Sequence, residues 1–166
     1  YFAGRRDMNP NQPMPSDANS TMRMSYGTIK VYSPADAVEY DYFTTTRGLL
    51  EKYTPGSPEF DIFPSFLELI KKGDWGRWAD KKDGKLHVAF ISTNDITGGN
   101  SGSPVFNAKG QLIGINFDRN WEGVAGDIQY LPSYQRSIIC DIRYVLLIID
   151  ELGGARRLID ELSLVP

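Results

Sequence analysis

The sequence feature that most constrains the fold is a run of small residues, Gly98-Gly99-Asn100-Ser101-Gly102-Ser103, between two strand-like segments. Glycine adopts backbone conformations that a Cβ atom would block, so this run predicts a sharp turn. Before it, residues 86–93 alternate between apolar and polar positions, which is typical of a half-buried strand. After it, residues 104–107 and 111–117 predict a tight hairpin. We therefore expect a mostly β domain in which strands flank this turn.

Ser101 is the residue that such a turn would present to a substrate. Chymotrypsin-like proteases hold their nucleophilic serine in a small-residue turn of this kind, just ahead of a strand. The glycines leave room for two N–H groups, those of Gly99 and Ser101, to converge as an oxyanion hole. Ser103 is the alternative nucleophile, but Pro104 follows it directly. Asn100 is expected to fix the loop by bonding nearby backbone.

Acyl transfer by serine also needs a histidine base and usually a carboxylate that orients it. The single histidine, His87, lies in the strand-like segment that precedes the turn, where we expect a structural role. The base is therefore expected on a segment outside this chain. We expect the chain by itself to be inactive.

The remaining segments predict more strands and a helical C-terminal end. Residues 7–19 hold three of the ten prolines, which is typical of an extended connector. The aromatic residues Tyr53, Trp75 and Trp78 are expected to pack rather than to bind a ligand. We also expect strands over 22–32 (with a bulge or bend at Gly27), 38–46 and 137–140; helices over 48–53, 64–72, 142–152 (capped by Asp141) and 155–162; and turns at 33–36 and 82–85.

Composition excludes several classes of function. The 166 residues carry a net charge of −3 and no basic patch, so a nucleic-acid partner is not expected. Cys140 is the only cysteine, which rules out an intrachain disulfide and a cysteine-based zinc site. We expect no metal and no cofactor. No apolar run is long enough to span a membrane, and the missing signal-peptide pattern and initiator methionine suggest an excised or mature piece.

Three long segments resemble one known family. They are residues 93–105, which include the Ser101 turn, then Gly114-Ile115-Asn116-Phe117-Asp118-Arg119-Asn120-Trp121-Glu122, and Asp141-Ile142-Arg143-Tyr144-Val145-Leu146. They are similar to the C-terminal catalytic part of the bacterial dipeptidyl-peptidases 7 and 11, with the second of these the nearer. Shorter likenesses at 17–21 and 40–45 extend the resemblance over nearly the whole chain.

The resemblance implies a fold and a division of labour. Such enzymes have a chymotrypsin-like double β-barrel with a large inserted helical domain, and remove dipeptides from free N-termini. Residues 20–166 would then be the second barrel with its C-terminal helix, and residues 1–19 a linker from the helical domain. The triad His and Asp would come from the N-terminal barrel, so the rest of the same chain is the first partner expected.

The resemblance also places specificity after the nucleophile, at Phe117, Asp118 and Arg119. In this family, glycine at the Arg119 position suits apolar side chains and arginine suits Asp or Glu, because a guanidinium pairs bidentately with a carboxylate. From the residues alone, Arg119 could instead pair with Glu122 or Asp127. Asp118 is a candidate for the substrate α-ammonium group, or for bonds to nearby backbone N–H groups.

Two other functions stay open on these residues. One is a non-catalytic chymotrypsin-like binding domain, and the other is an endopeptidase that resembles the glutamyl proteases. The family resemblance further implies a periplasmic or cell-surface location and a homodimer of the full-length protein.

Overall fold

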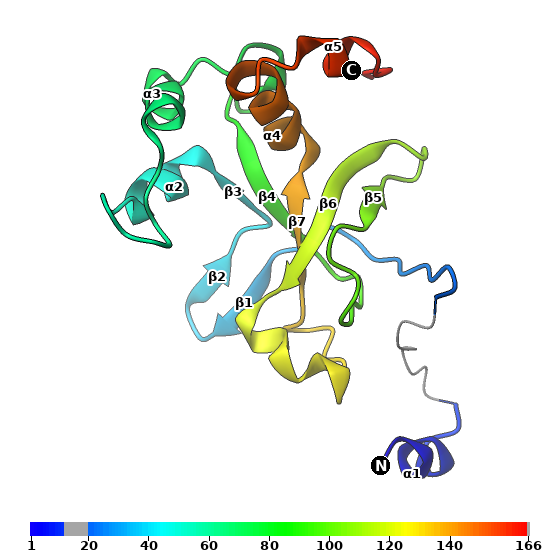
Figure 1. The fold of residues 1–166 in the computed structure, drawn as a ribbon. Coiled ribbons are helices and arrows are strands. Elements are labelled where there is room, and N and C mark those ends of the chain that lie inside the picture. Colours follow the sequence, from blue (N-terminus) through cyan, green and yellow to red (C-terminus); the bar gives the residue numbers. More distant parts are fainter. Residues whose placement is uncertain (12–19, 166) are drawn as a thin grey trace.

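A computed structural model describes residues 1–11 and 20–165 of the chain. Its centre is a five-stranded antiparallel sheet in the order β3-β4-β7-β6-β5, and a two-stranded hairpin, β1-β2, lies below one end of it (Figure 1). The predicted mostly β fold is confirmed. The strands are β1 (Tyr32–Ala35), β2 (Val38–Tyr40), β3 (Phe43–Thr45), β4 (His87–Ser92), β5 (Pro104–Phe106), β6 (Leu112–Arg119) and β7 (Ser137–Asp141).

The expected closed barrel is not formed by the part of the chain that the structure describes. The sheet is open, with the three-residue strands β3 and β5 at its two edges. The predicted strand over 22–32 is wrong for most of its length, since residues 22–31 of the described chain pair with the sheet through one isolated bridge, between Ile29 and Ser92. A Cβ on Gly27 would lie 2.6 Å from the backbone nitrogen of Asn94, so this glycine permits a close chain crossing rather than a bulge.

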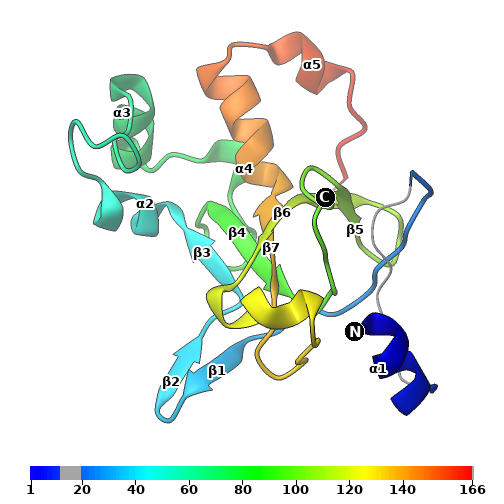
Figure 2. The same cartoon turned by 60° about the horizontal axis from the view of Figure 1, so that its bottom comes forward.

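Helices α3, α4 and α5 lie toward the end of the sheet where β4 begins, whereas α1 lies apart from them (Figure 2). The predicted helix over 64–72 is confirmed, and it ends at Gly73 in the left-handed conformation with φ of 67°. Asp141 caps the C-terminal helix as predicted, although that helix becomes π-helical from Ile148. The helices are α1 (Phe2–Met8), α2 (Thr46–Lys52), α3 (Pro64–Lys72), η1 (Gly76–Trp78), η2 (Trp121–Asp127), α4 (Ile142–Leu147), η3 (Ile148–Leu152) and α5 (Arg156–Asp160).

Three local predictions need correction. The segment over 38–46 is two strands rather than one, because the chain bends between β2 and β3. The predicted turn over 33–36 is mostly strand β1, and the turn itself falls at Asp36 and Ala37. The helix α1 lies inside the predicted linker and has no buried residue; residues 12–19, which hold the rest of that linker, lie outside the described residues.

The hydrophobic core lies between the start of β4 and the C-terminal helices. Its buried members are Trp78, Leu86, Leu146, Leu147 and Ile159, so Trp78 packs in the interior as expected. None of the helices in the described part of the chain is long and apolar enough to cross a membrane. Neither the Ser101 turn nor the end of β6 at Arg119 belongs to this core.

Strand β6 carries two features that shape that end of the sheet. A Cβ on Gly114 would lie 2.4 Å from Cγ2 of Ile139, so glycine is needed for β6 to approach β7. Further along, Asn116 pairs with Ile139 and Asp118 with Ile138, which leaves Phe117 as an extra residue in a β-bulge. The bulge breaks the alternation of the strand, and both Phe117 and Asp118 are exposed.

Candidate active site

The turn that carries Ser101 is tied to strand β6. Gly99 and Gly102 have φ of 91° and 84°, a region that only glycine enters without strain. The Gly102 N–H donates to the Asn116 carbonyl over 2.7 Å, and the Asn116 N–H donates to the Ser103 carbonyl over 2.9 Å. The turn predicted from the glycines is therefore present and is held in one register.

Asn100 fixes the same turn from within, as expected. Its Oδ1 accepts from the Thr97 N–H over 3.2 Å and from Nη2 of Arg23 over 3.1 Å. Nη1 of Arg23 also donates to Oγ1 of Thr97 over 2.9 Å. The sequence did not point to Arg23, because it lies some 75 residues earlier in a segment expected to be a strand.

The Ser101 hydroxyl is exposed and donates to the Phe117 carbonyl over 3.2 Å. The bulge in β6 presents this carbonyl, so Phe117 contacts Ser101 through its backbone. Among the described residues, the N–H groups of Gly99 and Ser101 have no acceptor. Two unused donors beside an exposed hydroxyl are what an oxyanion hole requires.

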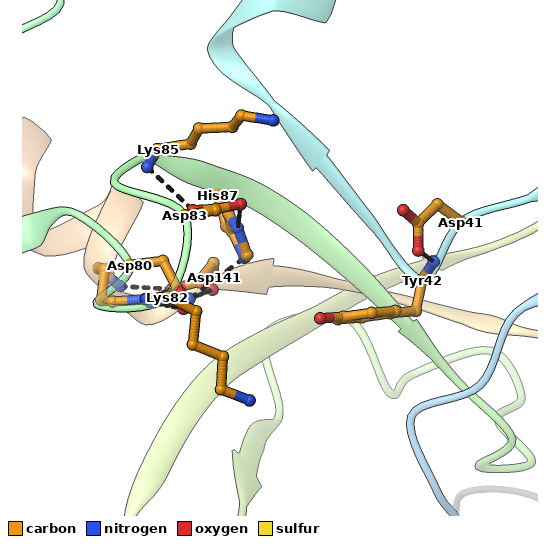
Figure 3. A network of polar contacts seen from close by, with 9 residues as sticks. Asp41, Tyr42, Asp80, Lys82, Asp83, Lys85, His87 and Asp141 are labelled. Atoms are coloured by element: carbon orange, nitrogen blue, oxygen red, sulfur yellow. Dashed lines mark hydrogen bonds and ion pairs between the residues drawn. The ribbon is translucent and has the colours of Figure 1, made fainter.

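His87 lies elsewhere, in a polar cluster at the opposite end of the sheet that also contains Asp80, Asp83, Asp141 and Arg143 (Figure 3). Its Nε2 is 3.0 Å from Oδ2 of Asp83, and its ring stacks on Phe43 at 3.9 Å between centroids. Among the contacts of the described residues, none joins His87 to Ser101. The geometry agrees with a structural role for this histidine.

Arg143 compensates the negative charge of this cluster. It donates from Nε and Nη2 to the two oxygens of Asp141 over 3.0 and 2.7 Å, and from Nη1 to Asp80 over 2.6 Å. The hydrogen bond from Arg143 lowers the pKa of Asp80 to about 2. Ligand-type atoms of Asp80, Asp83 and His87 lie within 4.8 Å of one another, and Arg143 already contacts two of these residues, Asp80 and His87.

Arg119 lies at the end of β6, two residues beyond the carbonyl that Ser101 contacts. Its Nη2 donates to the Ile96 carbonyl and to Oδ1 of Asp127, the latter over 2.9 Å, and its Nη1 donates to the Gly123 carbonyl over 3.3 Å. Nε is buried without an acceptor in the described part of the chain. The structure thus shows the pairing with Asp127 that the sequence left open, and none with Glu122.

Asp118 is exposed and faces its own backbone. Its Oδ1 accepts from the Arg119 N–H over 2.7 Å, while its other carboxylate oxygen has no donor among the described residues. One oxygen therefore stays available to a ligand. Asp118 directly follows Phe117, whose carbonyl accepts from the Ser101 hydroxyl.

The loop that carries Asp127 is anchored by a buried cation that the sequence did not reveal. Arg136 is 1% exposed and donates from Nε to the Lys30 carbonyl, from Nη2 to Val31 and from Nη1 to Pro132, over 2.9–3.0 Å. Its guanidinium also lies over the ring of Tyr32. Burial lowers the pKa of this arginine. The segment before β1 and the loop after η2 are joined through this side chain.

A comparison with protein families decides the relationship, because the model described as Peptidase S46 matches residues 1–164. The chain belongs to the peptidase S46 family. The match extends over the Ser101 turn, the β6 bulge and the C-terminal helices together. The family resemblance stated from the motifs is thereby confirmed.

The curated relatives include two differently named kinds of dipeptidyl-peptidase. The chain is 55% identical over its whole length to an Asp/Glu-specific dipeptidyl-peptidase of Porphyromonas gingivalis, and 54% identical over 99% of its length to dipeptidyl-peptidase 7 of the same organism. It spans about a quarter of these relatives, 23% in both cases. Overall identity therefore does not tell whether this chain is more similar to Asp/Glu-specific dipeptidyl-peptidases or to dipeptidyl-peptidases 7.

Solved S46 structures show the same fold. The chain matches crystal structures of Porphyromonas endodontalis DPP11 with a TM-score of 0.86 and 52% identity, over 97% of this chain and 23% of that one. Two of these structures are complexes with the dipeptides Arg-Asp and Arg-Glu. The matched quarter of DPP11 therefore has the same fold as this chain.

Proposed function

We propose that this chain is the part of a serine dipeptidyl-peptidase that carries the nucleophile, and that the whole enzyme releases dipeptides ending in Asp or Glu from free N-termini. The observation that carries the proposal is the exposed Ser101 hydroxyl beside the unused N–H groups of Gly99 and Ser101. The names of the S46 relatives supply the reaction class. The turn supplies the atoms that perform it.

The chemistry follows from those atoms. Oγ of Ser101 adds to the carbonyl carbon of the second residue of the peptide, and the hydroxyl proton passes to a base on another segment of the enzyme. The N–H groups of Gly99 and Ser101 receive the negative charge that forms on the carbonyl oxygen. The base then gives this proton to the leaving nitrogen, so the shortened peptide departs as a free amine, and water hydrolyses the dipeptide ester on Ser101.

Acidic specificity is assigned to Arg119. The relatives of the two specificities are equally similar to this chain, so a local residue must decide, and a guanidinium at the end of β6 suits a carboxylate. Phe117 would line the pocket, since its side chain is 47% exposed beside the nucleophile. The free carboxylate oxygen of Asp118 would receive the substrate α-ammonium group, which fixes the cut after two residues.

A fluorophosphonate probe on the full-length protein tests the nucleophile. The protein should be labelled, and Ser101→Ala should abolish labelling while Ser103→Ala retains it. An intact protein that takes no label would favour the non-catalytic domain. Cleavage of an N-terminally blocked peptide at an internal Asp or Glu would favour the glutamyl-type endopeptidase.

Arg119→Gly tests the specificity. Loss of a desolvated charge pair costs about 2–5 kcal/mol, so kcat/KM for peptides with Glu in second position should fall at least 30-fold. Peptides with an apolar second residue should be cleaved as well as before or better. Equal cleavage of acidic peptides by the variant would contradict the assignment.

The setting of the whole enzyme is also part of the proposal. We expect the full-length enzyme in the bacterial periplasm or at the cell surface, as a homodimer whose substrates are peptides with free N-termini. Fractionation and light scattering of the full-length protein measure these two properties.

A further inference from the structure

The guanidinium of Arg119 is held in place by backbone and neutralised by a single side chain. The carbonyls of Ile96 and Gly123 accept from it without bringing a full charge. Asp127 brings the only carboxylate within hydrogen-bonding distance of Arg119 among residues 1–11 and 20–165. Two contacts therefore orient the cation, and the third compensates it.

The pairing with Asp127 is weak by its geometry. One oxygen, Oδ1, contacts one nitrogen, Nη2, so the bond is not the two-pronged pair that a guanidinium forms with a well-placed carboxylate. The Asp127 side chain is 63% exposed, whereas that of Arg119 is 12% exposed. A pair with one solvated member contributes little and is readily exchanged for a better one.

A second carboxylate nearby is already committed. Asp95 accepts from Nε2 of Gln135 over 3.0 Å, and burial raises its pKa. It lies close enough to Arg119 for the two charges to interact, but it makes no hydrogen bond to it. Asp127 is therefore the group that can leave without disrupting the surrounding packing.

We propose that Asp127 is an internal stand-in for the acidic side chain of the substrate. When peptide binds, that side chain displaces Asp127 from Arg119. This inference rests on the proposed function, and it adds a residue that tunes specificity. The stand-in keeps Arg119 charge-paired when the site is empty. It also competes with every acidic substrate, so it weakens their binding and leaves apolar substrates unaffected.

The test uses Asp127→Asn and Asp127→Ala in the full-length protein. KM for peptides with Glu in second position should fall about fivefold, with kcat changed less than twofold, because an exposed ion pair is worth up to about that factor. Calorimetry with a dipeptide that ends in Glu should show the same gain in affinity. Peptides with an apolar second residue should be unaffected.

Glu122→Gln is the matched control. It removes the same charge from the same helix η2, but Glu122 bonds Tyr32 and Asn120 rather than Arg119. Its KM for acidic peptides should stay within twofold of the wild type. A gain as large as that of Asp127→Asn would assign the effect to net charge and overturn the inference.

Two outcomes separate this inference from the proposed function. If the wild type prefers acidic peptides and the Asp127 variants leave KM unchanged or raise it, the inference fails alone. If the wild type releases no acidic dipeptide, both fail. A crystal structure with an acidic dipeptide in which Asp127 still contacts Arg119 would also overturn the inference.

Discussion

Two arginines at opposite ends of the same strand pair differ in how fully carboxylates pair their charges. Arg119 ends β6 opposite Ser137, and Arg143 follows β7 beyond the pairing of Gly114 with Asp141. Arg143 contacts two carboxylates, one of them through both oxygens, whereas Arg119 contacts one oxygen of an exposed carboxylate. All three nitrogens of the Arg143 guanidinium therefore donate to carboxylates, whereas one nitrogen of Arg119 does so.

The surroundings of the two arginines explain the difference. The Arg143 cluster sits beside the core that Leu86 and Leu147 form, where an unpaired charge would be costly. The carboxylate beside Arg119 is solvated instead, since the Asp127 side chain is 63% exposed and that of Asp141 only 7%. The two arginines therefore differ in the burial of their carboxylate partners and not in their own, because the Arg119 side chain is 12% exposed and that of Arg143 30%.

The largest expected effect is a loss of activity without a loss of stability, at the end of the sheet where Arg119 lies. Ser101→Ala in the full-length protein should lower kcat/KM by about a thousandfold or more, because the nucleophile is lost. The melting temperature should stay unchanged, since the exposed hydroxyl makes one hydrogen bond. Peptide hydrolysis and thermal unfolding measure the two quantities. A Ser103→Ala variant that loses as much activity would contradict the assignment.

Exchanging each arginine for methionine is the next sharpest test. Arg143→Met leaves Asp80 and Asp141 without their counter-charge and should cost about 2–4 kcal/mol. Arg119→Met should cost less than about 1 kcal/mol but should abolish the preference for acidic peptides. Hydrogen exchange at the amides of β7 and α4 reports the local opening free energy. Similar stability losses in the two variants would break the comparison.

Removing the charge of the carboxylate that faces each arginine should also destabilise the protein more at Arg143 than at Arg119, by a smaller amount than exchange of the arginines. Asp141→Asn keeps an oxygen that can cap α4 but removes the charge facing Arg143, so we expect a loss of about 1–3 kcal/mol. Asp127→Asn should change stability by less than about 0.5 kcal/mol. Melting temperatures of the two variants, measured side by side, check the difference. A larger loss in Asp127→Asn would mean that its pairing is structural.

Local signals account for the parts of this molecule that could be predicted. The glycines predicted the Ser101 turn, and the alternation of apolar and polar residues predicted β4 and the β5-β6 hairpin. Asp141 predicted the start of the helix that it caps. These signals act within a few residues of one another. They pointed to Ser101 and to the N–H groups of Gly99 and Ser101, which all belong to one turn.

Long-range pairing accounts for what the sequence missed. Residues 22–31 alternate like a strand, but they are held by single contacts such as Thr93 N–H to the Thr28 carbonyl, and by Arg136, more than 100 residues away. A cation buried among carbonyls leaves no local pattern. The bulge at Phe117 was equally invisible, because no glycine marks it.

The smallest expected effect is a pH dependence at the Arg143 end. The pKa of Asp80 falls from its ordinary value of 3.8 to about 2 in the folded protein, so its ionised form stabilises the fold. That contribution, on the order of 1–2 kcal/mol, is present above about pH 4 and is lost as the pH falls towards 2. The Asp80 side chain is 20% exposed, so solvent screens little of it.

Asp80→Asn isolates this contribution from those of the other carboxylates. The gap in melting temperature between wild type and variant should be largest near about pH 6 and should close as the pH falls below about 3. Asp74→Asn is the control, since Asp74 forms an exposed pair with Lys72 and should show a small gap at every pH. A gap for Asp80→Asn that stays constant through the acid range would mean that Arg143 does not hold this carboxylate ionised, and the contrast with Arg119 would lose its electrostatic basis.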